Sequence, residues 1–106
     1  MSARISPAAQ PYTPEIKAAL DLFGRRWALR ILWELRAKPL TFRDLQDACG
    51  DISPAVLNTR LAELRDAAIV AQEPGGYRLT PDGATLITAL LPLHDWADRW
   101  ANRAKR

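Results

Sequence analysis

The feature that most constrains the fold is a capped amphipathic helix that passes directly into a short hairpin. Ser53 is a typical N-cap, and Pro54 follows at the first helical position, where the missing N–H costs no hydrogen bond. The predicted helix runs to about Ala67. The runs "IVAQE", "PGG" and "YRLT", over residues 69–80, then predict two strands joined by a glycine-bearing turn.

Three further helices are predicted before Ser53. The first covers residues 14–23 and the second residues 25–38, each with apolar residues at helical spacing. Trp27, within the second, is expected in the core. The third helix, residues 42–49, is short and has Thr41 as its predicted N-cap. The chain thus has a compact helical body ahead of the capped helix and the hairpin.

The two ends of the chain differ in pattern. Residues 1–13 contain two prolines and no apolar period, so we expect a flexible N-terminal arm. Residues 81–106 return to helical spacing, and Pro92 within them should kink the helix at a cost of about 3 kcal/mol. At 106 residues the chain is long enough for one core but not for two. We therefore assign residues 14–106 to a single domain.

The order of elements predicts a mainly α fold with a small β-hairpin, the winged helix-turn-helix. The helix that begins after Ser53 is then the recognition helix. Its leucines, Leu57, Leu61 and Leu64, share one face and should pack on the body. The opposite face carries small or hydrogen-bonding side chains such as Asn58, which suit base edges and phosphates in a DNA groove.

Charge is a weaker guide to the partner. The formal net charge is +3, which is compatible with a polyanion but does not require one. Because acidic residues balance arginines within the recognition helix, phosphate contacts should come from other elements, with Arg43 and Arg78 preferred. Arg60 either contacts DNA or braces the fold. The candidate DNA contacts are Arg43, Ser53, Ala55, Asn58, Thr59, Arg60 and Arg78.

Several runs resemble one known family. The segments "ALDLFGRRWALRILWEL", "ISPAVLNTRLAEL" and "LTPDG", together with Trp96, are similar to the HxlR-type winged helix-turn-helix transcriptional regulators, from about Pro14 to Trp100. The resemblance implies a bacterial or archaeal homodimer that binds operator DNA and is joined by its first and last helices. The candidate interface residues are Ile16, Leu20, Phe23, Leu90, Leu93, Trp96 and Trp100.

The chain departs from this family in two places. Many members carry a cysteine at the start of the first helix, used by some as a redox sensor, where this chain has Thr13 or Pro14. The predicted wing is also shorter than usual, which argues against contact of its tip with the minor groove. If the protein senses a signal, the sequence therefore favours a ligand over oxidation.

The four tryptophans leave two interpretations open. Trp33 and Leu29 form a second apolar ridge on their helix, and Trp96 and Trp100 lie one turn apart near the C-terminus. These side chains either pack in a subunit interface or hold a small, planar aromatic effector. The candidate effector pocket is Leu29, Trp33, Trp96 and Trp100.

Other functional classes find little support. One cysteine, Cys49, and one histidine, His94, can form neither an internal disulfide nor a Cys/His metal cage. We expect Cys49 to be a packed, inert thiol, and we expect no cofactor. No catalytic set or phosphate loop is apparent, so an enzyme is not predicted. Without a signal peptide or an apolar run of spanning length, a cytoplasmic protein with no membrane partner is expected.

These observations predict a sequence-specific, homodimeric DNA-binding regulator, in the role of a repressor, on a palindromic operator and open to control by a ligand. The alternative is a winged-helix module that binds proteins through the neutral helix face and the ridge at Trp33. Salt separates the two, because DNA binding must weaken steeply as the salt concentration rises.

Overall fold

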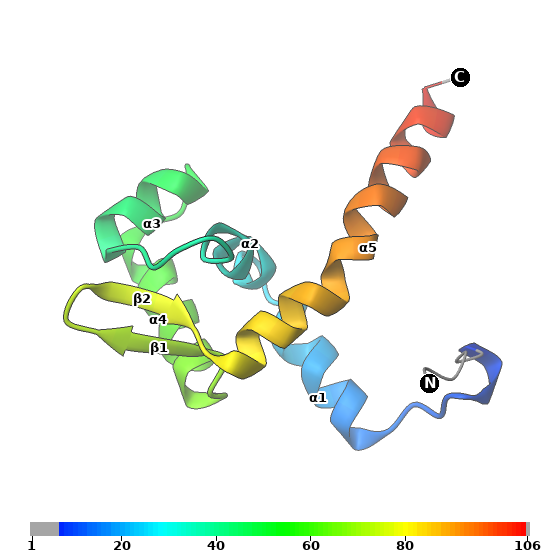
Figure 1. The fold of residues 1–106 in the computed structure, drawn as a ribbon, viewed down its shortest axis with the longest axis horizontal. Coiled ribbons are helices and arrows are strands. Elements are labelled where there is room, and N and C mark those ends of the chain that lie inside the picture. Colours follow the sequence, from blue (N-terminus) through cyan, green and yellow to red (C-terminus); the bar gives the residue numbers. More distant parts are fainter. Residues whose placement is uncertain (1–6, 106) are drawn as a thin grey trace.

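The protein is a helical body with a β-hairpin on one side and a long C-terminal helix, which confirms the predicted fold class. The computed structural model describes residues 7–105 of the chain. The first six residues of the predicted arm, and Arg106, lie outside the described residues. The elements are η1 (Pro7–Ala9), α1 (Pro14–Phe23), α2 (Ala28–Glu34), α3 (Phe42–Cys49), α4 (Pro54–Asp66), β1 (Val70–Glu73), β2 (Gly76–Leu79) and α5 (Pro81–Ala104). In Figure 1, α2, α3, α4 and the hairpin lie together, and the C-terminal half of α5 projects away from them.

Side-chain caps set the first residue of most of the helices. At α1, α3, α4 and α5 a hydroxyl oxygen accepts a hydrogen bond from the backbone N–H three residues further on, at 3.1–3.2 Å. Each cap is worth about 1 kcal/mol. The predicted caps Thr41 and Ser53 are confirmed, and Thr13 and Thr80 act in the same way.

Helix α2 is shorter than the predicted span of residues 25–38. Trp27, directly before it, has a left-handed backbone with φ of 77°, which no residue inside an α-helix can adopt. At the other end the side chain of Arg36 donates to the carbonyl oxygen of Trp33 at 2.8 Å and closes the last turn. Trp27 itself is only partly buried against the core, so its predicted place inside the core is wrong.

Leucines and isoleucines of α2, α3 and α4 form the centre of the core. The predicted inward face of α4 is confirmed, because Leu57, Leu61 and Leu64 are all 0% exposed. The other fully buried large side chains are Ile31, Leu32 and Leu45. Burying a leucine of this kind stabilises the fold by about 2–3 kcal/mol, so this face fixes α4 on the body.

The hairpin is antiparallel and has a two-residue turn at Pro74 and Gly75. A third extended segment, which the sequence analysis did not predict as a partner, lies beside it. Leu40 and Tyr77 exchange both backbone hydrogen bonds, at 3.0 and 2.7 Å. Gly76 makes this approach possible, since its φ is 137° and a Cβ there would overlap the carbonyl of Leu40.

Helix α5 begins inside the body and ends outside it. Gly83, in its first turn, is buried, and a Cβ there would overlap the carbonyl of Ile69. The helix remains continuous across Pro92, the residue at which a kink was predicted. From Leu91 onward most side chains are exposed. Within residues 7–105, no helix combines the length and the apolar character that crossing a membrane demands.

Candidate nucleic-acid interface

The outward side of α4 gathers the predicted base-reading side chains. Ser53, Ala55, Asn58 and Thr59 are all exposed, on the opposite side from the buried leucines. We call these four residues the reading face. A shallow hollow of about 300 Å³ lies on the same side and is lined by Asn58, Thr59, Ala62 and Arg65. Asn58 and Thr59 are both exposed, so their hydrogen-bonding groups are accessible.

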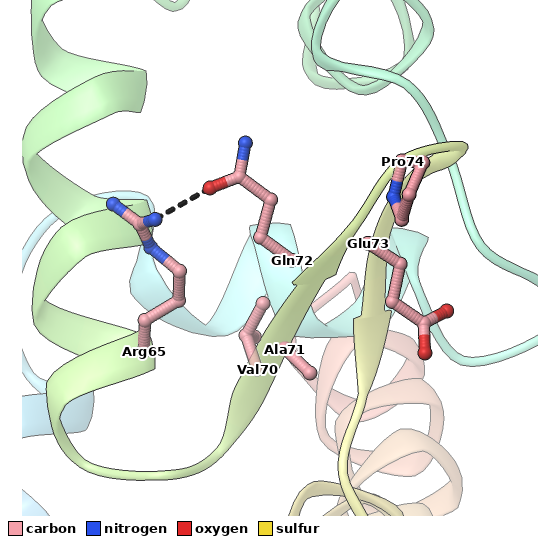
Figure 2. A pocket seen from close by; sticks show the side chains of 6 residues that line it. All are labelled: Arg65, Val70, Ala71, Gln72, Glu73 and Pro74. Atoms are coloured by element: carbon pink, nitrogen blue, oxygen red, sulfur yellow. Dashed lines mark hydrogen bonds between the residues drawn. The ribbon is translucent and has the colours of Figure 1, made fainter.

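Arg65 joins this surface to the hairpin and was not among the predicted DNA contacts. Its Nη1 donates to Oε1 of Gln72 on β1 at 2.5 Å, and Figure 2 shows the two side chains directed toward each other. They border an open hollow of about 570 Å³ lined by Arg65, Val70, Ala71, Gln72, Glu73 and Pro74. A signal was present in the sequence: Arg65 follows Asn58 by seven residues, which is two helical turns on one face.

Arg60 lies on α4 but faces the body. Its Nε donates to the carbonyl oxygen of Arg26 at 2.9 Å, and its Nη1 lies 3.1 Å from Oε1 of Glu63. Arg25 binds the other oxygen of Glu63 at 2.5 Å. Of the two roles that the sequence left open for Arg60, these contacts favour bracing.

The two preferred phosphate contacts, Arg43 and Arg78, differ in their surroundings. Arg43 is exposed in the first turn of α3 and forms no ion pair with any residue in the range 7–105. Arg78 is half-buried on β2, and its Nε donates to Oε2 of Glu73 at 2.7 Å. The positive charge of Arg78 is therefore partly offset within the hairpin, whereas that of Arg43 is available.

A second set of exposed side chains is apolar and lies on α1 and on α5. Most of the candidate interface residues expose about half of their side chains: Ile16 42%, Leu20 53%, Leu93 51%, Trp96 47% and Trp100 56%. The rings of Trp96 and Trp100 stack 5.6 Å apart. Leu91, 46% exposed, belongs to the same set but was not predicted. Exposed large apolar side chains in such numbers are typical of contact surfaces.

Two candidate interface residues instead contact other parts of the same chain. Phe23 is partly buried against the core, and Leu90 lines a cavity between α2 and α5. This cavity, the α2–α5 pocket, has a volume of about 240 Å³. It is lined by Leu29, Arg30, Trp33, Ile87, Leu90, Leu93 and His94.

The pocket differs from the predicted effector site. Leu29 and Trp33 line it, but Trp96 and Trp100 do not. Instead the ring of Trp33 stacks on that of His94, with 6.1 Å between centroids and 10° between planes. The predicted grouping of four residues therefore divides into two separate clusters within one chain. His94 and Arg30 are lining residues that the sequence analysis missed.

The lone cysteine and histidine have opposite environments. Cys49 is 4% exposed, and burial raises the pKa of its thiol, with a smaller lowering by the Arg30 charge and a raising by Glu34. Burial of this kind keeps a thiol protonated and slow to react. Nδ1 of His94 lies 3.7 Å from carboxylate oxygens of both Asp95 and Asp98 on the open side of α5. All three of these side chains are exposed, so water can solvate them.

The chain matches one known family, and the arrangement of α4 and the hairpin agrees with that match. The family model described as HxlR-like helix-turn-helix matches residues 22–105. The chain belongs to this family. Its two curated relatives are named as HTH-type transcriptional regulators, so the chain belongs to a family of helix-turn-helix transcriptional regulators, which are not enzymes.

Two curated relatives come from Bacillus subtilis (strain 168). The HTH-type transcriptional regulator YodB is 30% identical over 94 residues, which are 82% of this chain and 84% of YodB. YvaP, an uncharacterized HTH-type transcriptional regulator, is 29% identical over 94 residues, or 82% of this chain and 87% of YvaP.

Solved structures share the fold of this HxlR-like chain. The crystal structure of quinone-bound YodB has a TM-score of 0.76 at 31% identity, covering 82% of this chain and 98% of that one. A protein from Enterococcus faecalis V583 assigned to the MarR family of transcriptional regulators has a TM-score of 0.77 at 28% identity, covering 92% and 96%. YodB has also been solved in its reduced and diamide-treated forms.

Proposed function

We propose that this HxlR-like regulator is a homodimeric repressor that recognises a palindromic operator with the reading face of α4. One observation carries the proposal. Four small or hydrogen-bonding side chains are exposed on one side of α4 while three leucines on the other side are 0% exposed. A helix fixed so firmly, with so little bulk on its free side, fits the major groove.

Each side chain of the reading face has a specific capacity. The amide of Asn58 can both accept and donate, which matches N6 and N7 of adenine. Thr59 offers a hydroxyl to a base edge, and the methyl of Ala55 can contact a thymine methyl. Ser53 already accepts the N–H of Val56 at 3.1 Å, so its O–H remains free to donate to a phosphate. Asn58 is therefore the main determinant of sequence preference.

Phosphate contacts fix the register of the protein on the duplex. Arg43, with no ion pair among the described residues, and Arg65, at the edge of the reading face, are the best placed. Arg65 also links α4 to the wing through Gln72. A phosphate contact at Arg65 would order α4 and the wing together. The modest net charge of +3 agrees with few such contacts for each subunit.

A dimer places two reading faces on one site. The exposed apolar side chains of α1 and α5, such as Leu20 and Trp100, need a cover, and a second copy supplies a matching surface under two-fold symmetry. Two α4 helices related in this way would enter successive major grooves about 34 Å apart. An operator with inverted half-sites follows from the symmetry.

The decisive experiment selects the operator and then tests the reading face. Binding selection from random duplexes, followed by footprinting, should yield an inverted repeat. Asn58→Ala should lose about 1–3 kcal/mol of operator affinity and relax preference at one base position. Arg65→Ala is a control on the same helix, since a phosphate contact should weaken binding to all sequences alike.

The protein-binding alternative predicts a different result. If Asn58→Ala and Thr59→Ala together leave affinity and sequence preference intact, α4 does not read DNA. Binding that is insensitive to salt would point in the same direction, because release of counterions makes DNA affinity fall steeply with salt.

A further inference from the structure

The α2–α5 pocket combines an apolar wall with one guanidinium. The wall consists of Leu29, Trp33, Ile87, Leu90 and Leu93. Arg30 and His94 complete the lining. In other proteins an apolar cavity of about 150 Å³ holds benzene. At about 240 Å³, this pocket has room for one ring with a small substituent.

Arg30 has one donor group available to a ligand. Its Nε donates to Oε2 of Glu34 at 2.7 Å, and its Nη2 donates to the carbonyl oxygen of Ala48 at 2.8 Å. Its Nη1 makes no hydrogen bond to any residue between 7 and 105. Since guanidinium groups bind carboxylates strongly, an anionic group can complete the shell of Arg30 at the edge of the apolar wall.

The wall also favours an aromatic ring. Trp33 and His94 are stacked with 10° between their planes, and aromatic pairs gain about 0.5–1.5 kcal/mol beyond the area that they bury. Three aliphatic side chains, Ile87, Leu90 and Leu93, line the part of the pocket that belongs to α5. A flat ring can lie between these surfaces while its substituent reaches Arg30.

We propose that this pocket binds a single-ring aromatic carboxylate and that the bound compound lowers operator affinity; the regulatory half rests on the proposed function. The pocket touches both parts of the molecule that a dimeric regulator must couple. Arg30 holds the carbonyl of Ala48 near the end of α3, the helix that precedes the recognition helix. Leu93, across the pocket, is part of the exposed apolar surface of α5.

Occupancy changes the angle between the body and α5. A carboxylate that binds Nη1 of Arg30 places a second negative charge beside Glu34, and the ring separates α2 from α5. In the proposed dimer that angle sets the distance between the two α4 helices. The compound binds more tightly to a form of the dimer in which the distance between the α4 helices does not fit the operator. It therefore shifts the population away from the DNA-bound form.

Benzoate is the probe for the full-length chain, and benzamide is its neutral match in shape. Calorimetry or ligand-observed NMR should show benzoate binding to the wild type at least about tenfold more tightly than benzamide, since a charge-assisted hydrogen bond is lost in the amide. Arg30→Gln should remove this preference, and Arg30→Lys should restore part of it. Leu29→Trp, which fills the cavity, should abolish binding of both compounds.

Three results would overturn the proposal for the ligand: no benzoate binding at concentrations up to about 10 mM, equal binding to benzamide, or unchanged binding to folded Leu29→Trp. Circular dichroism verifies that each variant is folded. Arg43→Gln is the matched control, since it removes an arginine outside the pocket and should keep benzoate binding while it weakens DNA binding.

The proposed effect of the ligand on regulation is tested by measuring the affinity of the protein for its operator. Saturating benzoate should lower operator affinity about tenfold or more in the wild type and leave Leu29→Trp unaffected. Benzoate binding without any change in operator affinity would overturn this half alone. A chain that binds benzoate but no DNA would instead refute the proposed function, so the two failures are distinguishable.

Discussion

The Nε of Arg60 donates a hydrogen bond to the backbone carbonyl oxygen of Arg26, 2.9 Å away, and so ties the middle of α4 to the loop between α1 and α2. The side chain of Arg60 is only 21% exposed. The same loop is bound to Glu63 of α4 through Arg25. The position of the reading face thus depends on a polar clamp as well as on the leucines beneath it.

Arg60→Ala should lower the free energy of unfolding by about 1–3 kcal/mol, because the carbonyl of Arg26 loses its charged donor and the carboxylate of Glu63 keeps only Arg25. Chemical denaturation measures this change. Arg65→Ala, at an exposed position on the same helix, should cost less than about 1 kcal/mol. Full stability in Arg60→Ala together with a lost phosphate contact would restore Arg60 to the DNA surface.

The variants Arg43→Ala and Arg78→Ala allow a second comparison. Arg43→Ala should weaken binding to every duplex and reduce the slope of log affinity against log salt by about one unit. Arg78→Ala should change the slope less, because the guanidinium of Arg78 is already paired with Glu73 at 2.7 Å. Titrations at several salt concentrations test both variants, and an equal loss of slope in the two would show that the ion pair opens on DNA.

Two glycines should respond in opposite ways to an added methyl group. Gly83→Ala should destabilise the fold by about 1–3 kcal/mol, since its Cβ would overlap the backbone carbonyl of Ile69. That cost exceeds the gain of about 1 kcal/mol in helix propensity. Gly75→Ala, at a position with open space, should be neutral or stabilise by about 0.4–1 kcal/mol. Thermal melts of the two variants provide the comparison, and a stable Gly83→Ala would mean that α5 can move away from Ile69.

Local chemistry explains what the sequence predicted well. Thr41 and Ser53 cap helices through hydrogen bonds to N–H groups three residues away, so their effect is visible in a short window. The buried face of α4 follows from the spacing of its leucines alone. Neither feature depends on what the rest of the chain does.

Features that join distant segments were not predictable in this way. The start of α2 depends on the left-handed backbone of Trp27, in a loop held by Arg60 from a point 34 residues away. Leu40 pairs with Tyr77 across a similar distance. The neighbours of Trp33 depend on the path of α5, which brings in His94 and leaves Trp96 outside the pocket. Periodicity places a side chain on a face but does not identify its partner.

Oxidants should leave the operator affinity of this protein unchanged. Cys49 is 4% exposed, and burial raises the pKa of its thiol above the ordinary value of 9.0, so the reactive thiolate is scarce at neutral pH. We expect diamide to leave operator affinity unchanged, both in the wild type and in Cys49→Ala. A several-fold loss of affinity in the wild type that Cys49→Ala abolishes would show that Cys49 is a sensor.

The raised pKa of the Cys49 thiol also affects the free energy of unfolding at alkaline pH. A thiol whose pKa is higher in the folded state keeps its proton longer there than in the unfolded chain. The unfolding free energy should therefore fall as the pH rises above about 9.0, where the unfolded thiol begins to ionise. Cys49→Ala should lack this part of the decline. Denaturation curves from neutral pH to the alkaline range, compared between wild type and variant, isolate it from other groups.

The apolar surface of α1 and α5 should be needed for assembly but not for folding of the chain. Leu20 and Trp100 are 53% and 56% exposed, so a charge at either position costs the single chain little. In a dimer interface the same charge would lose its water without gaining a partner. Leu20→Glu and Trp100→Glu, tested separately, should each be folded and monomeric at micromolar concentration in sedimentation experiments. Each should bind the full operator no better than one half-site.

Asn102→Glu is the control, because it adds the same charge at an exposed polar position on α5 and should leave the dimer intact. Removal of the residues after Leu91 should act like the two charge variants, since it takes away Leu93, Trp96 and Trp100 together. A truncated chain or a Leu20→Glu chain that still sediments as a stable dimer would place the interface elsewhere. The exposed face of α1 and α5 would then need a different partner, and the spacing of the two reading faces could no longer be set by α5.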